Sequence, residues 1–194
     1  MNPLLDFSGL PRYGEIEPAH IAPAIDELLA MARAAVKRAE QSEPTWEAFV
    51  EPLEDANERL ARAWGQVAHL HAVLDSPGMR GAYNQCLPEV TRYWTELGQN
   101  LALFEKYRAL SESPGFSVLS AARRRIVENS LRDFRLAGAE LEPAQKARFA
   151  RVQQELATLS AKFSENVLDA TNGYALVIED ERRLAGIPAD AHPR

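Results

Sequence analysis

The chain has 194 residues, of which 46% are hydrophobic and 26% charged, values typical of a folded globular protein with one large domain or one domain and a remnant. Its formal net charge is −6, which argues against a nucleic-acid or anionic-membrane partner because phosphate neutralisation needs a surplus of Lys and Arg. The chain has no signal-peptide pattern and no apolar run of about 18 residues, so a cytoplasmic location is expected.

The first 17 residues are predicted to form an extended arm. Proline and glycine recur there and break any regular period. An arm with this many apolar side chains needs a protein surface to lie on. The expected anchors are Leu4, Leu5, Phe7 and Leu10.

Helical periodicity begins after this arm. The first helix is expected to begin at about Pro18 or Pro23 and to end near Gln41. Its regular part is expected to start close to Ala22, because Pro18 and Pro23 are tolerated only near a helix start. Its predicted buried stripe is Ile25, Leu28, Leu29, Ala32 and Val36.

Two further helical regions are predicted over residues 45–74 and 79–111. Prolines interrupt both: Pro52 is expected to kink or split the first region, and Pro88 to break the second. The apolar faces are expected at Leu53, Leu60, Trp64, Val67, Leu70, Trp94, Leu97, Leu101 and Phe104.

A fourth helix is predicted over residues 118–136 and a fifth over 143–172. The fifth is the most regular, about 45 Å long at the usual helical rise. Its apolar residues step by three or four, which predicts the buried seam of an antiparallel bundle. These residues are Phe149, Val152, Leu156, Leu159, Phe163 and Val167.

The period changes at Tyr174–Ile178, a short apolar run rich in strand formers that predicts one buried strand. The sequence offers no second strand candidate, and a lone strand cannot satisfy its backbone groups. Its partner is therefore expected to be missing, which favours a fragment. The predicted fold is mainly α: an arm over 1–17, an antiparallel helical bundle over 18–173, and a strand and tail over 174–194.

No catalytic, cofactor-binding or metal-binding residue is predicted in this chain. The four histidines form no His-Glu-x-x-His motif, and His69 and His71 lie about 200° apart around a helix, too far to share a metal. His20, at a helix start, is expected to cap or pack, and His192 lies in the tail. The only cysteine, Cys86, is expected to be a buried structural thiol, and without a possible intramolecular disulfide it favours a reducing compartment.

Charged residues on the second helix form ladders four residues apart. Glu54 and Glu58 precede Arg62, and Glu51 and Asp55 precede Arg59. Such ladders are more typical of solvated Glu–Arg pairs than of a catalytic acid and base. The basic run Arg123-Arg124-Arg125 is a weak nucleic-acid signal, since on a helix its members point in three directions.

Three segments carry a family resemblance: NPLL at residues 2–5, FSGLPRYGEIEPAHIAPAID at 7–26 and ERRLAGIP at 181–188. They resemble the front part of the oligopeptidase A branch of the thimet oligopeptidase–neurolysin family of zinc metallopeptidases. The resemblance covers nearly the whole chain to Pro188. It implies a helical lobe that forms one wall of a peptide channel.

The resemblance also implies that zinc and the catalytic residues belong to a part of such enzymes that follows this region. The isolated chain is thus expected to be inactive. Its expected partners are short peptides, bound by the complete enzyme, the missing catalytic domain, and other copies of the chain through exposed surfaces. The alternative is a free-standing helical module that binds a protein or peptide without catalysis.

Overall fold

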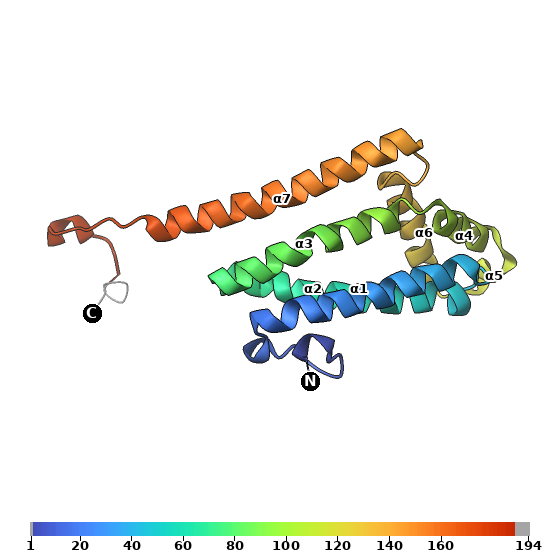
Figure 1. Cartoon of the computed structure of the whole chain (residues 1–194), viewed down its shortest axis with the longest axis horizontal. Coiled ribbons are helices and arrows are strands. Elements are labelled where there is room, and N and C mark those ends of the chain that lie inside the picture. The colour runs from blue at the N-terminus through green and yellow to red at the C-terminus, as the bar shows by residue number, and fades with distance from the viewer. Residues whose placement is uncertain (1, 189–194) are drawn as a thin grey trace. The chain divides into compact units, whose positions relative to one another are not determined.

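A computed structural model describes residues 2–188 (Figure 1). Within them the chain forms seven α-helices and no β-strand, so the predicted mainly α fold is confirmed. Two compact units are present, one ending at Thr158 and the other beginning at Leu159. Among the described helices, none is long and apolar enough to cross a membrane.

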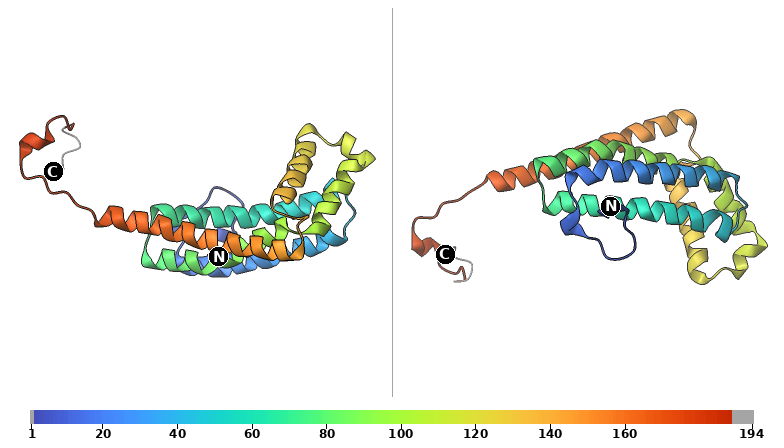
Figure 2. Two further views of the ribbon diagram at one scale, coloured as in Figure 1. Left: turned by 90° about the horizontal axis from the view of Figure 1, so that it is seen from above. Right: turned by 60° about the horizontal axis from the view of Figure 1, so that its bottom comes forward.

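Three long helices form the first layer of the larger unit: α1 (Pro18–Gln41), α2 (Glu51–Val73) and α3 (Pro77–Gly98). They run side by side, and α1 contacts both of the others (Figure 2). Their shared core is apolar on the predicted faces. It includes Ile21, Ile25, Leu28, Ala32, Leu60, Val67, Leu70, Val90 and Tyr93.

Of the two predicted starts of α1, Pro18 is confirmed, and the helix is regular from there and not only from about Ala22. A reciprocal cap explains this: the backbone N–H of Glu17 donates to His20 Nδ1 at 3.1 Å, and the Glu17 side chain accepts from the His20 backbone. Pro18 occupies the first helical position, where its missing N–H has no helical partner to lose. Pro23 is then accommodated inside the helix.

The arm lies against α1 and α2 through a 3-10 turn at Pro3–Leu5. Asn2 ties it down, since its side-chain amide donates to the His20 carbonyl at 2.8 Å while its Oδ1 accepts from the Leu4 N–H at 3.0 Å. Leu4 is fully buried, and Leu5 and Phe7 pack on the same core. Leu10 is not an anchor as predicted, because it is 91% exposed.

A second core joins the ends of α1 and α2 to three shorter helices. These are α4 (Leu101–Glu112), α5 (Pro114–Val118) and α6 (Ala121–Leu136). A π-helical turn at Trp46–Val50 leads into this core just before α2, so the predicted split at Pro52 is confirmed. Its buried residues include Phe49, Val50, Leu53, Leu103, Phe104, Tyr107, Leu110, Val127 and Phe134.

Pro88 does not break the third helical region; α3 runs through it and stops at Gly98. The break falls at Gln99–Asn100, where the Asn100 side chain accepts from the Leu103 N–H at 3.0 Å and starts α4. Gly98 allows α3 to approach the end of α6 closely, since a Cβ there would lie 2.6 Å from the Cβ of Ala137, the residue that follows α6. The break between α3 and α4 therefore follows the cap at Asn100 and the close contact at Gly98, and not Pro88.

The last helix, α7 (Pro143–Gly173), has the predicted length, but its apolar stripe is not a buried seam. Its apolar residues at 152, 156, 159, 163 and 167 are 49–70% exposed. Over residues 143–158 two polar contacts hold the helix: Lys146 Nζ donates to the Gln99 carbonyl at 3.0 Å, and Gln154 donates to the Pro88 carbonyl at 2.9 Å. Of the predicted seam only Phe149 is partly buried, so the prediction of a buried seam is wrong.

The predicted strand over Tyr174–Ile178 is also wrong for this chain. Residues 174–180 have no regular secondary structure, and Tyr174, Leu176 and Val177 are exposed. A strand needs a hydrogen-bonded neighbour, and the described chain offers none. A 3-10 turn at Glu181–Leu184 follows. The predicted tail, with His192, lies outside the described residues.

Candidate functional site

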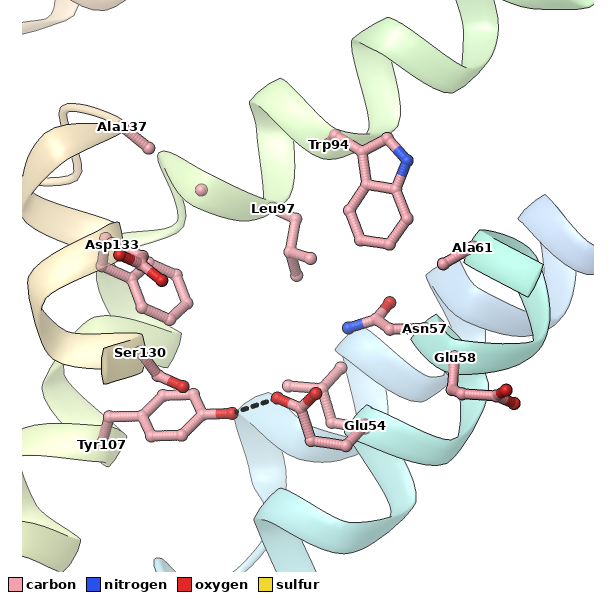
Figure 3. A pocket seen from close by; sticks show the side chains of 13 residues that line it. Glu54, Asn57, Glu58, Ala61, Trp94, Leu97, Tyr107, Ser130, Asp133 and Ala137 are labelled. Carbon is pink, nitrogen blue, oxygen red and sulfur yellow. Dashed lines mark hydrogen bonds between the residues drawn. The ribbon is translucent and has the colours of Figure 1, made fainter. Parts of the chain in front are cut away.

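A cavity of about 500 Å³ opens where α2, α3, α4 and α6 meet (Figure 3). Both apolar and polar side chains line it. The apolar wall comes from Leu53, Ala61, Trp94, Leu97, Phe134 and Ala137. The polar groups are Glu54, Asn57, Glu58, Tyr107, Ser130 and Asp133.

One polar pair links α2 to α4 at the edge of this cavity. The Tyr107 hydroxyl donates to Glu54 Oε1 at 3.0 Å (Figure 3). Desolvation by the surrounding protein raises the pKa of the Glu54 carboxyl, although part of the side chain remains exposed. Burial likewise raises the pKa of Tyr107, with the nearby Glu54 charge as a second cause. The pair therefore keeps the tyrosine hydroxyl protonated as a donor.

A second polar pair links α2 to α3. The Tyr93 hydroxyl donates to Asn57 Oδ1, and both residues are buried, with Asn57 only 8% exposed. Burial raises the pKa of Tyr93 to about 12. Because its oxygen is held by Tyr93, the Asn57 amide nitrogen faces the interior of the cavity (Figure 3).

The cavity therefore offers an amide donor, a carboxylate acceptor and an apolar wall with the Trp94 ring. This combination suits a ligand with polar backbone groups and apolar side chains. Among residues 2–188 there is no group of three or more His, Cys, Asp or Glu side chains able to hold a metal ion.

The described histidines lie apart from this cavity, and each has a local partner. His20 completes the cap of α1. The ring of His69 meets that of Tyr13 at 5.2 Å, and the ring of His71 stacks on Tyr83 at 4.1 Å. The expected capping role of His20 is confirmed.

Cys86 is buried in the first core, as predicted. Burial raises the pKa of its thiol to about 11, and the Asp26 charge adds to this rise. The thiolate is the reactive form of cysteine, so Cys86 is a poor nucleophile in the folded chain.

The charged residues predicted to form a solvated face on α2 are mostly exposed, but the predicted Glu–Arg pairs do not form among them. Arg59 and Arg62 instead reach the arm, where their guanidinium groups lie 5.4 Å and 5.9 Å from the centre of the Phe7 ring. Arg62 also donates to the Gly9 carbonyl. These arginines hold the arm to α2, a long-range contact that local spacing does not reveal.

The three members of the basic run do point in different directions. Arg123 lies over the Trp46 ring at 4.8 Å, Arg124 donates to the Leu119 carbonyl at 2.6 Å, and Arg125 pairs with Glu128 at 3.4 Å. They therefore form separate local contacts and not one basic patch.

Sequence reasoning missed the cavity and its two hydrogen-bonded pairs. Glu54 and Asn57 are three residues apart on one helix, yet their partners come from α4 and α3. No local sequence pattern predicts these hydrogen-bonded pairs, because they depend on how four helices cross.

Comparison with known proteins identifies the class to which this fold belongs. Residues 25–146 match the model of the family described as Neurolysin/Thimet oligopeptidase, N-terminal domain. This match covers more than half of the chain and all of α2 to α6. The chain therefore belongs to this family, as the resemblance predicted.

Individual members of related families show how similar this chain is to known proteins. The chain is 42% identical over 191 residues to Oligopeptidase A of Haemophilus influenzae, across 98% of this chain and 28% of that protein. It is 39% identical over 191 residues to the Organellar oligopeptidase A, chloroplastic/mitochondrial, of Arabidopsis thaliana, across 98% of this chain and 24% of the relative. It is 28% identical over 193 residues to the Dipeptidyl carboxypeptidase of Escherichia coli, across 96% of this chain and 28% of that protein. The chain thus spans about a quarter of the length of these relatives.

Proposed function

We propose that this chain is the N-terminal helical portion of an oligopeptidase A-like zinc metallopeptidase that cleaves short peptides. The observation that carries the proposal is the similarity to Oligopeptidase A proteins along 98% of this chain and about a quarter of theirs. In this proposal the helical lobe supplies one wall of a peptide channel and limits access to short, unfolded peptides.

Zinc and the catalytic groups would lie in the remaining three quarters of such a protein. The 194 residues contain no His-Glu-x-x-His motif, the pattern that places two zinc ligands and a general base on one helix. This supports a role for the chain in binding and access, with the peptide bond broken elsewhere.

Within that role, the cavity of Figure 3 is the proposed contact point for peptide on this lobe. The Asn57 amide can donate to a peptide carbonyl, the Glu54 carboxylate can accept from a peptide N–H, and the Trp94 ring can contact an apolar side chain. All three groups belong to rigid helices, so a peptide would meet a preformed surface.

A cytoplasmic location is part of this proposal. It is supported by the composition of the chain and by its 38% identity over 191 residues to a relative named Probable cytosolic oligopeptidase A in Arabidopsis thaliana.

The test is to read the gene beyond the Arg194 codon and to compare the longer product with the 194-residue chain. We expect a continuing frame with His-Glu-x-x-His, whose product cleaves a fluorogenic peptide, loses activity to a chelator and regains it with zinc. The 194-residue chain should show neither stoichiometric zinc nor cleavage. A stop after Arg194, or chelator-sensitive cleavage by the short chain alone, would overturn the proposal; the stop would favour a free-standing helical module.

A further inference from the structure

The cavity of Figure 3 carries charge of one sign. Its charged lining residues are all acidic: Glu54 and Glu58 on α2, and Asp133 on α6. No Lys or Arg is among the described residues that line it. All of its walls belong to the first compact unit of the chain. A cation is therefore the charged group that this cavity favours.

The packing of the arm explains why the carboxylates on α2 lack a cation. By helical spacing, the expected partner of Glu58 is Arg62, four residues later. Arg62 instead donates to the Gly9 carbonyl and lies over the Phe7 ring. Within the described chain, no ion pair involves Glu54 or Glu58. The arm thus withdraws an arginine from this side of α2 and leaves negative charge at the cavity.

Asp133 adds less to this charge than Glu54. Its Oδ1 lies 2.7 Å from the guanidinium group of Arg132, so part of its charge is compensated. Both side chains of this pair are well exposed, and exposed pairs contribute little. Glu54 is therefore the carboxylate on which selection for a cation depends.

The Glu54 carboxylate has room for a second partner. It points toward the interior of the cavity, and the Tyr107 hydroxyl donates to its Oε1 (Figure 3). Within the described chain, its Oε2 accepts no hydrogen bond. Desolvation raises the pKa of this carboxyl, and no neighbouring cation opposes that rise. A cation bound beside Glu54 would supply the opposite charge.

A buried amide gives independent evidence that a polar ligand fits this cavity. Asn57 is only 8% exposed and its Oδ1 accepts from Tyr93, but its Nδ2 donates to no group of the described chain. This nitrogen points into the cavity (Figure 3). A peptide carbonyl is an acceptor that suits such a donor. The site thus presents a donor for a peptide backbone together with an acceptor for a cation.

We propose that this cavity binds a basic side chain of a peptide and prefers arginine to lysine. The inference rests on the proposed function of the lobe and names the residue type that the lobe selects. In this arrangement the guanidinium group pairs with Glu54 and lies against the Trp94 ring, while a carbonyl of the peptide accepts from Asn57 Nδ2.

The shape and chemistry of the cavity suit arginine. A guanidinium group pairs with a carboxylate through two parallel hydrogen bonds and stacks on aromatic faces, whereas an ammonium group is a compact, strongly hydrated charge. The volume of about 500 Å³ lies within the roughly 300–1,000 Å³ typical of pockets for small ligands. It therefore has room for one long side chain and the adjoining peptide backbone.

Two tripeptides that differ only in charge test the preference. Both are acetylated and amidated, and the central residue is arginine in one and its uncharged near-isostere citrulline in the other. Each is titrated into the 194-residue chain to about 5 mM, and nuclear magnetic resonance follows the Trp94 indole and Asn57 amide signals. We expect the arginine peptide to shift both signals and to bind roughly five- to tenfold more tightly than the citrulline peptide. A lysine peptide should bind with intermediate affinity.

Glu54→Gln tests whether this carboxylate is the group that selects the charge. The substitution keeps an acceptor for Tyr107 and should reduce the arginine preference to about twofold or less. Glu27→Gln is the matched control, because Glu27 is exposed on α1 and does not line the cavity. It should keep the wild-type preference. Circular dichroism should show the same helix content in both variants.

The outcomes separate this inference from the proposed function. Equal affinity for the two peptides, or the same arginine preference in Glu54→Gln as in Glu27→Gln, overturns the selection for a basic residue and leaves the peptide contact in place. Signal shifts that spare both Trp94 and Asn57 overturn the location. Binding of neither peptide overturns the cavity as a peptide site, while the peptidase assignment still depends on the gene beyond Arg194.

Discussion

The Tyr93–Asn57 hydrogen bond makes a sharp prediction about stability. Tyr93→Phe removes only the hydroxyl that donates to Asn57 Oδ1, and both side chains are buried. The phenyl ring still fills its site, so the change leaves no large void. What remains is an amide oxygen without its donor at the junction of α2 and α3.

The expected cost is about 1–3 kcal/mol of the free energy of unfolding, the range for a buried polar group that loses its partner. Urea reports unfolding with a slope of roughly 2 kcal/mol per molar, so the midpoint should fall by about 0.5–1.5 M. Replacing both partners by apolar groups is much less costly. The double variant Tyr93→Phe/Asn57→Leu should therefore recover most of the loss.

The assay is urea unfolding followed by circular dichroism at 222 nm, at a concentration at which the chain is monomeric. Tyr174→Phe is the matched control, because Tyr174 is exposed and lies outside the bundle core. Its midpoint should match wild type. If Tyr93→Phe shifts the midpoint no more than this control, or if the double variant is less stable than the single one, the reasoning fails.

Three other changes test separate features. Because burial raises the pKa of Glu54, its ionised carboxylate lowers stability at neutral pH, and Glu54→Gln should raise the melting temperature at pH 7.5. This gain should vanish once the pH falls below the pKa of Glu54 in the unfolded chain, where the carboxyl is protonated in both states. An equal gain at neutral and at acidic pH would refute burial as the cause. Gly98→Ala should destabilise the chain by about 1–3 kcal/mol, because the new Cβ would lie 2.6 Å from the Cβ of Ala137. Gly81→Ala, which faces open space on α3, should stabilise it by about 0.5–1 kcal/mol. If thermal unfolding showed the reverse order, the close approach at Gly98 would be contradicted. Cys86, with its pKa raised to about 11, should react with an aromatic disulfide reagent at pH 8 orders of magnitude more slowly than in 8 M urea, and similar rates would show that the thiol is accessible.

Local signals predicted the helices well. The predicted region ends near residues 74 and 111 and the predicted split at Pro52 all lie within two residues of observed helix boundaries. Proline and glycine stand at these places, in the segments Asp75–Gly78 and Ser113–Gly115 and at Pro52. These residues act on the chain next to them, through fixed dihedral angles, missing donors and side-chain caps. Pro88 shows the limit of such signals. Helix α3 continues through it, and the break between α3 and α4 lies eleven or more residues later, where Asn100 caps the start of α4.

The sequence by itself determined the mainly α fold, the extent of α7 and membership of the neurolysin/thimet oligopeptidase family, because periodicity, prolines and the segment at residues 2–26 are readable without a partner. Only the tertiary structure decided which apolar faces are covered. The stripe of α7 and the run at 174–178 have ideal patterns for burial, yet both are exposed. The cavity, likewise, exists only where four helices cross. The physical reason is that burial and strand pairing depend on surfaces distant in the chain. A local apolar pattern shows that a segment can be buried or paired, but not whether the folded chain provides the surface that covers it.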